Sequence, residues 1–222
     1  MNTFMSDPRT LAIAGILLDR LPEPARSVLV VGCGSGREAA VLAHALQADV
    51  RGIDLVDQFD PEASKHARLE RGDATAISYA DESFDVVYSY HALEHIPESG
   101  RALREMRRVL RPGGTYCIGT PNRARLLGYI GGGSTLREKL RWNLADWRAR
   151  LTGRFRNEYG AHAGFTSAEL RNLLSENFST ASDVSTEYYR RLYSRHQVLL
   201  GVICAPGLRQ LAFPSVYFVG ER

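Results

Sequence analysis

Three glycines and an aspartate mark the part of this chain whose residue types could bind a ligand. The apolar run Val28–Val31 leads directly into Gly32, Gly34 and Gly36. Glycines at alternate positions let the backbone turn sharply and keep side chains out of a ligand's way. The spacing is not that of the dinucleotide fingerprint, and no Gly-Lys-Ser/Thr triplet follows, so the loop suits a ligand without a polyphosphate. Asp54 ends the next predicted strand, where a carboxylate can accept hydrogen bonds from both hydroxyls of a ribose.

The elements that must position these residues alternate between strand and helix. Apolar runs and turn residues predict strands over 28–31, 49–54, 84–90, 115–120, 180–189 and 215–220. Helical spacing and capping residues predict helices over 8–21, 37–47 and 101–111, from about 134, and after the capping box Thr166–Glu169. A strand, a glycine loop and a helix in this order are typical of a parallel sheet in an α/β protein. We therefore expect a single domain over residues 1–222.

Composition sets limits on the compartment and the partners. An apolar fraction of 44% is ample for one core, and a net charge of +3 is too small to indicate nucleic acid. The three cysteines, Cys33, Cys117 and Cys204, are odd in number and scattered. This usage favours a reducing, cytoplasmic setting, and neither structural zinc nor any other metal is predicted. The apolar runs Leu11–Leu18 and Val198–Pro206 are too short to span a bilayer, and no cleavable signal peptide is visible.

Four segments in unbroken order between residues 28 and 122 resemble one known family. Val28–Gly36 resembles the first motif of class I S-adenosylmethionine-dependent methyltransferases, and Gly72-Asp73-Ala74 precedes an aromatic-Asp-aliphatic strand as in that family. His91–Pro97 resembles the Leu-Glu-His-Ile/Val-Pro segment of its small-molecule members, and Leu110–Gly114 its Leu-Arg-Pro-Gly-Gly turn. The region around His162, followed by Phe-Thr and a helix, resembles ubiquinone-biosynthesis-like O-methyltransferases.

The resemblance implies a fold, a cofactor and a set of binding residues. The fold is a Rossmann-like, doubly wound, mostly parallel seven-stranded sheet with helices on both faces and an antiparallel closing strand. The cofactor is S-adenosylmethionine, with the Asp73 carboxylate on the exocyclic amine of adenine and the Ala74 N–H on a ring nitrogen. The implied cofactor-binding residues are Gly32, Cys33, Gly34, Gly36, Asp54, Leu55, Asp73, Ala74 and His91.

Methyl transfer from a sulfonium is an in-line displacement that needs no metal, so the protein mainly aligns the nucleophile and excludes water. A hydroxyl nucleophile also benefits from a general base, for which histidine is typical. His91 and His95 follow the fourth strand, and His162 lies on a later loop that should close over the substrate. We predict His162 and then His95 as catalytic residues. The expected acceptor is a small or lipid-linked molecule methylated on oxygen, with nitrogen the less favoured alternative.

One position departs from the family pattern and keeps two other functions open. The first strand of the family carries an acid two residues before the first glycine, and this chain has Val30 there. One alternative is a nicotinamide-dependent oxidoreductase, although the glycine spacing and the Gly-Asp-Ala segment count against it. The other is a non-catalytic S-adenosylmethionine-binding module that docks on a partner or a membrane.

A basic segment interrupts the pattern after Asn122, and residues 123–160 are interpreted as an inserted helical lid. Residues 123–156 hold nine Lys/Arg against Glu138 and Asp146, a net charge of +7 that leaves −4 for the rest of the chain. The predicted helix gathers apolar residues within one narrow arc: Leu136, Leu140, Leu144, Trp147 and Leu151. Arginines follow one edge of that arc, and Trp142 faces away: Arg137, Arg141 and Arg148.

Two interpretations of this segment stay open. The helix either packs its leucines on the domain, or forms a lid that meets an anionic substrate or a membrane surface through 134–156. Residues 190–213 are interpreted as a second insertion near the substrate side. The sequence makes no prediction about the oligomeric state.

Overall fold

A computed structural model describes residues 3–129, 134–159, 163–196, 198, 200, 201, 204 and 208–222. Strands in this part of the chain form a seven-stranded sheet in the order β3-β2-β1-β4-β5-β7-β6. They are β1 (Ser27–Val31), β2 (Asp49–Asp54), β3 (Arg68–Arg71), β4 (Phe84–Tyr90), β5 (Leu110–Pro121), β6 (Ser182–Asp183) and β7 (Ser215–Glu221). The first five strands pair in parallel, and β7 runs antiparallel to both β5 and β6. The predicted mostly parallel sheet with an antiparallel closing strand is confirmed.

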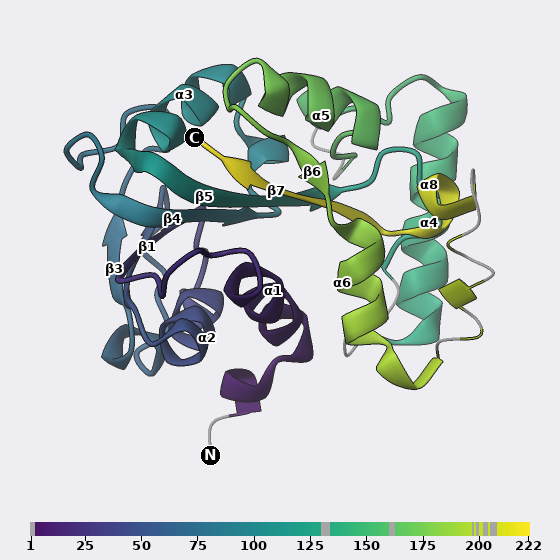
Figure 1. The fold of residues 1–222 in the computed structure, drawn as a ribbon. Coiled ribbons are helices and arrows are strands. Elements are labelled where there is room, and N and C mark those ends of the chain that lie inside the picture. The colour runs from purple at the N-terminus through teal and green to yellow at the C-terminus, as the bar shows by residue number, and fades with distance from the viewer. Residues whose placement is uncertain are drawn as a thin grey trace.

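Helices cover both faces of the sheet (Figure 1). On one face lie α1 (Pro8–Leu18), α2 (Arg37–Leu46) and α6 (Ser185–Leu192), and on the other α3 (Ser99–Val109) and α5 (Ser167–Ser175). Beyond one end of the sheet lie α4 (Leu136–Leu151) and α8 (Leu208–Ala212). Short 3-10 turns are η1 (Thr3–Ser6), η2 (Ala63–Lys65), η3 (Leu93–His95), η4 (Asn157–Tyr159) and η5 (Ser194–His196). None of the helices within the described ranges combines the length and the apolar composition that crossing a membrane requires.

Capping residues fix the start of three helices. Asp7 accepts a hydrogen bond from the backbone N–H of Thr10 at 3.2 Å, and proline occupies the first position of α1. Thr166 and Glu169 form the predicted capping box of α5, and Thr135 with Glu138 forms another at α4. These caps satisfy backbone donors that would otherwise lack partners, and they fix where each helix begins.

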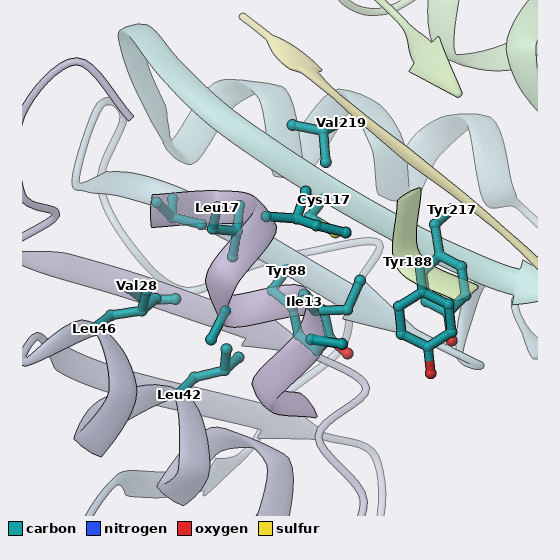
Figure 2. Packing of buried hydrophobic residues seen from close by; sticks show 14 of the residues in the cluster. Ile13, Leu17, Val28, Leu42, Leu46, Tyr88, Cys117, Tyr188, Tyr217 and Val219 are labelled. Atoms are coloured by element: carbon teal, nitrogen blue, oxygen red, sulfur yellow. The ribbon is translucent and has the colours of Figure 1, made fainter. Parts of the chain in front are cut away.

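Two hydrophobic clusters hold the helices to the sheet. The cluster under α1, α2 and α6 joins Ile13, Leu17, Leu42 and Tyr188 to strand residues such as Val28 (Figure 2). The cluster on the opposite face joins α3 and α5 to the same strands. A strand buried on both faces has a continuous apolar sequence, and for this reason Val28–Val31 could be predicted as a strand of a parallel sheet.

The predicted strand over 180–189 is wrong for most of its length. Only Ser182–Asp183 pairs with β7, and the chain then turns into α6. Val184 and Tyr188 are buried four residues apart, which is a helical rather than an alternating spacing. Asp183 accepts a hydrogen bond from the backbone N–H of Ser185 at 3.0 Å and so helps to start the helix.

The boundary between α3 and β5 also differs from the prediction. The helix ends at Val109 rather than at the Pro-Gly-Gly turn, and Leu110 already pairs with Phe84. The ladder resumes where Thr115 pairs with Val86, so the residues between form an irregularity inside the strand. Pairing of Leu110 with a buried neighbour starts the strand earlier than residue preferences alone indicate.

Candidate active site

Three adjoining cavities lie along the carboxyl ends of β1, β2, β4 and β5. Their volumes are about 470, 620 and 690 Å³. The strand order reverses between β1 and β4, and open α/β sheets bind ligands at such a switch point. His91, directly after β4, lines all three cavities. In the order of these volumes, we refer to them as the Asp54 cavity, the Glu38 cavity and the tyrosine cavity.

The glycine loop separates the Asp54 cavity from the Glu38 cavity. Gly32, Gly34 and Gly36 have φ angles of 72°, 52° and 82°, in the left-handed region that favours glycine. A Cβ atom at Gly32 would overlap the side chain of Ala92, whereas a Cβ at Gly34 would meet no atom within 4 Å. Gly34 therefore borders open space shared by both cavities. A ligand can approach the backbone of the loop at this position.

Asp54 ties the glycine loop to the end of β2. Its carboxylate accepts hydrogen bonds from the backbone N–H of Gly34 at 2.8 Å and from that of Val56 at 3.1 Å. A carboxylate has about four lone-pair directions, so each oxygen retains capacity for a further donor. The exposed Leu55 lines the same cavity. The structure thus brings the loop and the predicted ribose-binding acid together.

Asp73 and Ala74 lie across the same cavity from Asp54. One oxygen of Asp73 accepts two hydrogen bonds from Thr75, from its backbone N–H and its hydroxyl, each at 2.8 Å. The backbone hydrogen bond is the main reason that the pKa of Asp73 lies below its ordinary value. The carboxylate is therefore both held in a turn and ionised, as an acceptor for an amine should be.

The Glu38 cavity contains an acid that sequence reasoning missed. Glu38, in the first turn of α2, lines this cavity with Arg9 and the glycine loop. The hydroxyl of Tyr88 donates a hydrogen bond to its carboxylate at 3.2 Å, and burial raises the pKa of Glu38 to about 7. Tyr88 is paired directly with Val30, the position where the expected acid is absent. The Glu38 carboxylate from α2 thus contacts Tyr88, the strand neighbour of Val30. In the sequence, the only signal for it is the absence of an acid at position 30.

Cys33 has a packing role in this loop. Its side chain is 8% exposed, and burial raises the pKa of its thiol to about 12. A neutral, enclosed thiol is a poor nucleophile, so Cys33 contributes shape to the Glu38 cavity and no chemistry.

The tyrosine cavity is lined mainly by aromatic rings. They come from strands, from α6 and from the basic segment: Tyr90, Tyr129, Trp142, Tyr188, Tyr189, Tyr193 and Tyr217. Burial raises the pKa values of Tyr90, Tyr189 and Tyr217, so their hydroxyls stay neutral at physiological pH. Sequence reasoning assigned none of these rings to a binding site, because they converge from segments far apart in the chain.

His91 occupies the junction between the tyrosine cavity and the other two. Its φ angle is 52°, which is uncommon for a residue other than glycine and often marks a functional position. Its Nε2 atom and the hydroxyl of Ser215 lie 3.0 Å apart, within hydrogen-bond distance. The ring also packs against Tyr90, with centroids 4.0 Å apart.

The two histidines predicted as catalytic have different outcomes. His95 lines the Asp54 cavity rather than the tyrosine cavity, and its Nε2 atom lies 3.8 Å from a carboxylate oxygen of the buried Glu94. His162 lies outside the described residues. A catalytic role for either histidine stays a prediction.

Comparison with known proteins agrees with this geometry. Residues 29–118 match the family model described as a methyltransferase domain. The matched segment includes the glycine loop, Asp54, Asp73 and His91, and ends inside β5. The chain therefore contains a class I S-adenosylmethionine-dependent methyltransferase domain.

Particular relatives share this domain over less than half of their length. Methyltransferase GfsG of Streptomyces halstedii is 38% identical over 112 residues, which cover 46% of this chain and 40% of GfsG. The 2-methyl-6-phytyl-1,4-hydroquinone methyltransferase of a Synechocystis strain is 37% identical over 107 residues, covering 46% of this chain and 33% of that enzyme. Other curated relatives are named as N- and O-methyltransferases. The chain thus spans well under half the length of these relatives.

A solved structure shares the fold over nearly the whole chain. It is described as a putative S-adenosylmethionine-dependent methyltransferase from Methanococcus maripaludis. It superposes with a TM-score of 0.57 at 18% identity and covers 99% of this chain and 87% of its own. At this identity the likeness concerns the fold.

Proposed function

We propose that this chain is an S-adenosylmethionine-dependent methyltransferase that acts on an oxygen atom of a small or lipid-linked acceptor, with nitrogen as the less favoured alternative. The observation that carries the proposal is that the residues matched to the methyltransferase domain supply the whole lining of the Asp54 cavity, His91 included. When bound, the cofactor supplies an electrophilic methyl group. The protein has to bind it, orient the acceptor, exclude water and receive a proton.

The Asp54 cavity has the groups that an adenosine requires. Asp54 would accept hydrogen bonds from the two ribose hydroxyls, and Asp73 would accept one from the exocyclic amine of adenine. The backbone N–H of Ala74 would donate to a ring nitrogen, and the exposed side chain of Leu55 offers an apolar surface to the base. These four residues enclose one cavity, which supports the roles implied by the family resemblance.

The Glu38 cavity suits the amino-acid end of the cofactor. A partly buried carboxylate is favourably matched by an ammonium group, which lowers the cost of keeping it ionised. Glu38 therefore replaces the acid that the family carries at position 30. The open space beside Gly34 connects this cavity to the Asp54 cavity, so one ligand can occupy both.

Glu38→Gln is expected to remove a pH dependence of cofactor binding. Because the pKa of Glu38 is about 7, its carboxyl is neutral below that pH and charged above it. The affinity of the native protein for S-adenosylhomocysteine should rise roughly tenfold from about pH 5.5 to about pH 7.5. Titration calorimetry across this range would show a flat profile in the Gln variant. A flat profile in the native protein would contradict the role of Glu38, and Glu23→Gln, at an exposed acid, is the control.

Glu38→Gln should also change the pH dependence of stability. The pKa of Glu38 is raised on folding, so its contribution to stability is present at low pH and is lost as pH rises through about 7. Above pH 7 the unliganded Gln variant should therefore match or exceed the native protein in its free energy of unfolding. Urea denaturation at two pH values measures the difference, and a lower stability of the variant above pH 7 would contradict it.

Gly32→Ala is expected to affect mainly the stability of the protein, and Gly34→Ala mainly its affinity for the cofactor. Both variants adopt a left-handed backbone that costs alanine about 1–2 kcal/mol. The alanine at 32 also overlaps Ala92, which should lower the free energy of unfolding by a further 1–3 kcal/mol or so. The alanine at 34 meets no protein atom but fills ligand space, so it should raise the Kd for S-adenosylhomocysteine about tenfold or more. Denaturation and calorimetry on both variants test this, and unchanged binding in Gly34→Ala would contradict it.

The tyrosine cavity suits an acceptor with a flat apolar body. Aromatic rings at its wall exclude water and pack well against planar molecules. The side chains of Arg9 and Arg125 belong to the same lining, which favours an acceptor that also carries an anionic group. Hydroquinones and phenols with apolar substituents combine the flat apolar body with a hydroxyl nucleophile.

His91 is placed to act as the general base. It borders the cofactor cavities and the tyrosine cavity, and its neighbouring tyrosines are held neutral by burial. The Ser215 hydroxyl at 3.0 Å can orient the imidazole ring. His91 would thus both contact the cofactor and accept the proton of the acceptor hydroxyl.

The proposed function is tested by ligand binding and by methyl transfer. S-adenosylhomocysteine should stabilise the protein in a thermal shift assay and NAD should not; stabilisation by NAD alone would overturn the assignment in favour of an oxidoreductase. Incubation with labelled S-adenosylmethionine and a panel of hydroquinones, phenols and lipid extracts should yield a labelled product. Tight cofactor binding without transfer to any fraction would instead support a non-catalytic binding module.

A further inference from the structure

Helix α4 turns its apolar side outward and its polar side toward the protein, the reverse of an ordinary surface helix. The exposed fractions of its apolar residues decide this point: Leu136 74%, Leu140 62%, Leu144 54%, Trp147 50% and Leu151 88%. No residue of α4 is fully buried. Of the two interpretations from sequence, the structure contradicts the packing of these leucines on the domain.

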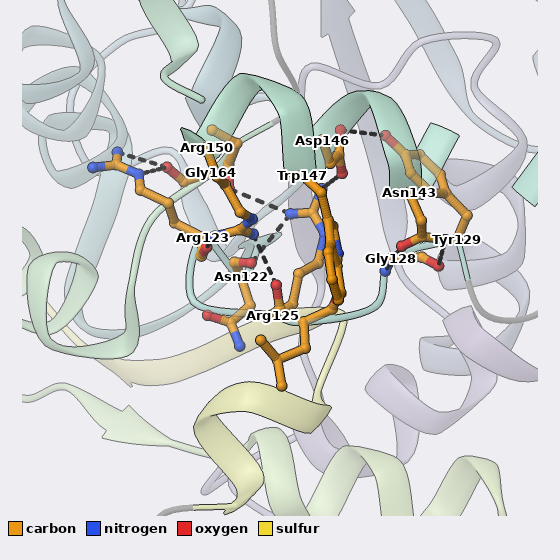
Figure 3. Close-up of polar contacts among 12 residues, drawn as sticks. Asn122, Arg123, Arg125, Gly128, Tyr129, Asn143, Asp146, Trp147, Arg150 and Gly164 are labelled. Carbon is orange, nitrogen blue, oxygen red and sulfur yellow. Dashed lines mark hydrogen bonds and ion pairs between the residues drawn. The ribbon is translucent and has the colours of Figure 1, made fainter. Parts of the chain in front are cut away.

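Polar contacts hold the inner side of α4 to the loop that follows β5 (Figure 3). Asp146 pairs with Arg125 at 3.1 Å, and both side chains are largely buried, with 14% and 5% exposed. Asn143 accepts a hydrogen bond from the backbone N–H of Gly128 at 2.7 Å. Arg150 donates two hydrogen bonds, each at 2.8 Å, to the backbone carbonyls of Arg123 and Arg125.

These contacts fix the rotation of the helix about its axis. Rotating the leucines inward would separate the buried charge of Arg125 from the Asp146 carboxylate and two backbone carbonyls from Arg150, which is costly. The capping box at Thr135 fixes the start of the helix as well. The outward apolar stripe is therefore a defined feature of the fold.

The stripe continues onto the neighbouring loop and has a basic edge. Trp147 donates a hydrogen bond to the backbone carbonyl of Leu126 at 2.8 Å, and Leu126 and Leu127 are each 53% exposed. Along the other edge the exposed arginines have no ion pair within the described part of the chain: Arg137, Arg141 and Arg148. Contiguous apolar surface of this kind marks an interaction site.

We propose that the outer face of α4, with Leu126 and Leu127, docks on the surface of a lipid bilayer that contains anionic lipids. The stripe runs along about 22 Å of helix, so α4 can lie flat with its leucines and Trp147 among the acyl chains. The three arginines then face the headgroups at the side of the helix. Leucine and tryptophan on one side and arginine beside them are the composition of interfacial helices.

Charge favours a membrane over a second copy of this chain as the occupant. Arg137, Arg141 and Arg148 are exposed along the edge of the stripe, and two copies joined through this face would bring the arginines of both copies together. Such like-charge contact opposes association, whereas an anionic bilayer is attracted by the same charges.

Docking would also place the tyrosine cavity close to the bilayer, a consequence that rests on the proposed function. Trp142 and Tyr129, whose rings lie 5.1 Å apart, line that cavity from the inner side of α4. The leucines lie on the opposite side of the same helix, and a helix with its side chains is about 10–12 Å across. An acceptor dissolved in the membrane would therefore have a short path to the cavity.

Vesicle flotation tests the apolar part of the proposal without requiring methyl transfer. The native protein should float with vesicles of phosphatidylcholine and phosphatidylglycerol and not with phosphatidylcholine alone. The double variant Leu140→Gln/Leu144→Gln should lose roughly tenfold or more of the partitioning. The matched control Leu11→Gln/Leu18→Gln changes two exposed leucines of α1 and should leave partitioning unchanged.

The basic edge is tested by a second pair of variants. Arg137→Gln/Arg141→Gln should lower partitioning into the anionic vesicles by roughly 10–30-fold. The control Arg104→Gln/Arg107→Gln removes two exposed arginines from α3 and should have no such effect. Circular dichroism of each variant verifies that the fold is retained.

Two results would overturn the proposal. One is failure of the native protein to float with anionic vesicles. The other is a dimer in analytical ultracentrifugation that Leu140→Gln/Leu144→Gln converts to a monomer, which would assign the stripe to contact between copies. Both are independent of cofactor binding, so a failure here is distinguishable from a failure of the methyltransferase assignment.

Discussion

Asp54→Ala is expected to raise the Kd for S-adenosylhomocysteine by roughly 100- to 1,000-fold. The Asp54 carboxylate accepts hydrogen bonds from Gly34 and Val56 and borders the Asp54 cavity, where it would also accept two bonds from a ribose. A hydrogen bond to a charged group contributes about 1.5–3 kcal/mol, so losing two ribose bonds at the lower end, about 1.5–2 kcal/mol each, corresponds to that range. Alanine also frees the Gly34 N–H, which loosens the loop that borders the Glu38 cavity.

Titration calorimetry measures this effect directly, and two variants make it specific. Asp57→Ala removes an exposed acid three residues away that lies outside the cavity, and it should leave the Kd within about twofold. Asp54→Asn retains one oxygen acceptor and should fall between the native protein and Asp54→Ala. A Kd for Asp54→Ala within a few-fold of the native value would refute the assignment of the ribose to this carboxylate.

His91→Asn is expected to lower kcat, measured at saturating cofactor, by roughly 100-fold or more. General bases typically contribute a factor of about 100–10,000. Asparagine tolerates the left-handed backbone of this position, so the fold should be retained while the base is removed. Raising the pH should partly restore the rate of the variant with a phenolic acceptor, because the acceptor then ionises without a base.

The measurement is the rate of S-adenosylhomocysteine formation with the best acceptor from the panel. His44→Asn is the matched control: this exposed histidine of α2 lines none of the three cavities, so the kcat of the variant should stay within a few-fold of native. A large loss of kcat in His95→Asn and a small loss in His91→Asn would assign the base to His95 instead.

Local patterns were sufficient for five strands of the sheet and for the glycine loop, whereas β3 was not predicted. The run into Gly32, Gly34 and Gly36 could be recognised because a buried strand and left-handed turns each demand particular residue types. Asp54 could be located because parallel strands deliver their carboxyl ends to one edge, whatever the distant chain does. Asp73 was located through the resemblance of Gly72-Asp73-Ala74 to the family segment. The 180–189 segment failed because tyrosine and valine suit a strand as well as a helix, and only packing against β7 and α1 selected the helix.

The sequence by itself determined the methyltransferase sheet, the glycine loop and the acids of the Asp54 cavity, since these depend on short-range spacing and on strand order. Tertiary structure alone brought the Glu38 carboxylate to Tyr88, the strand neighbour of Val30, because α2 had to pack where its first turn meets that ring. It also decided that the leucines of α4 face outward. Their arc was readable from spacing, but which side turns inward depends on buried partners such as Arg125, which lies in a different segment of the chain.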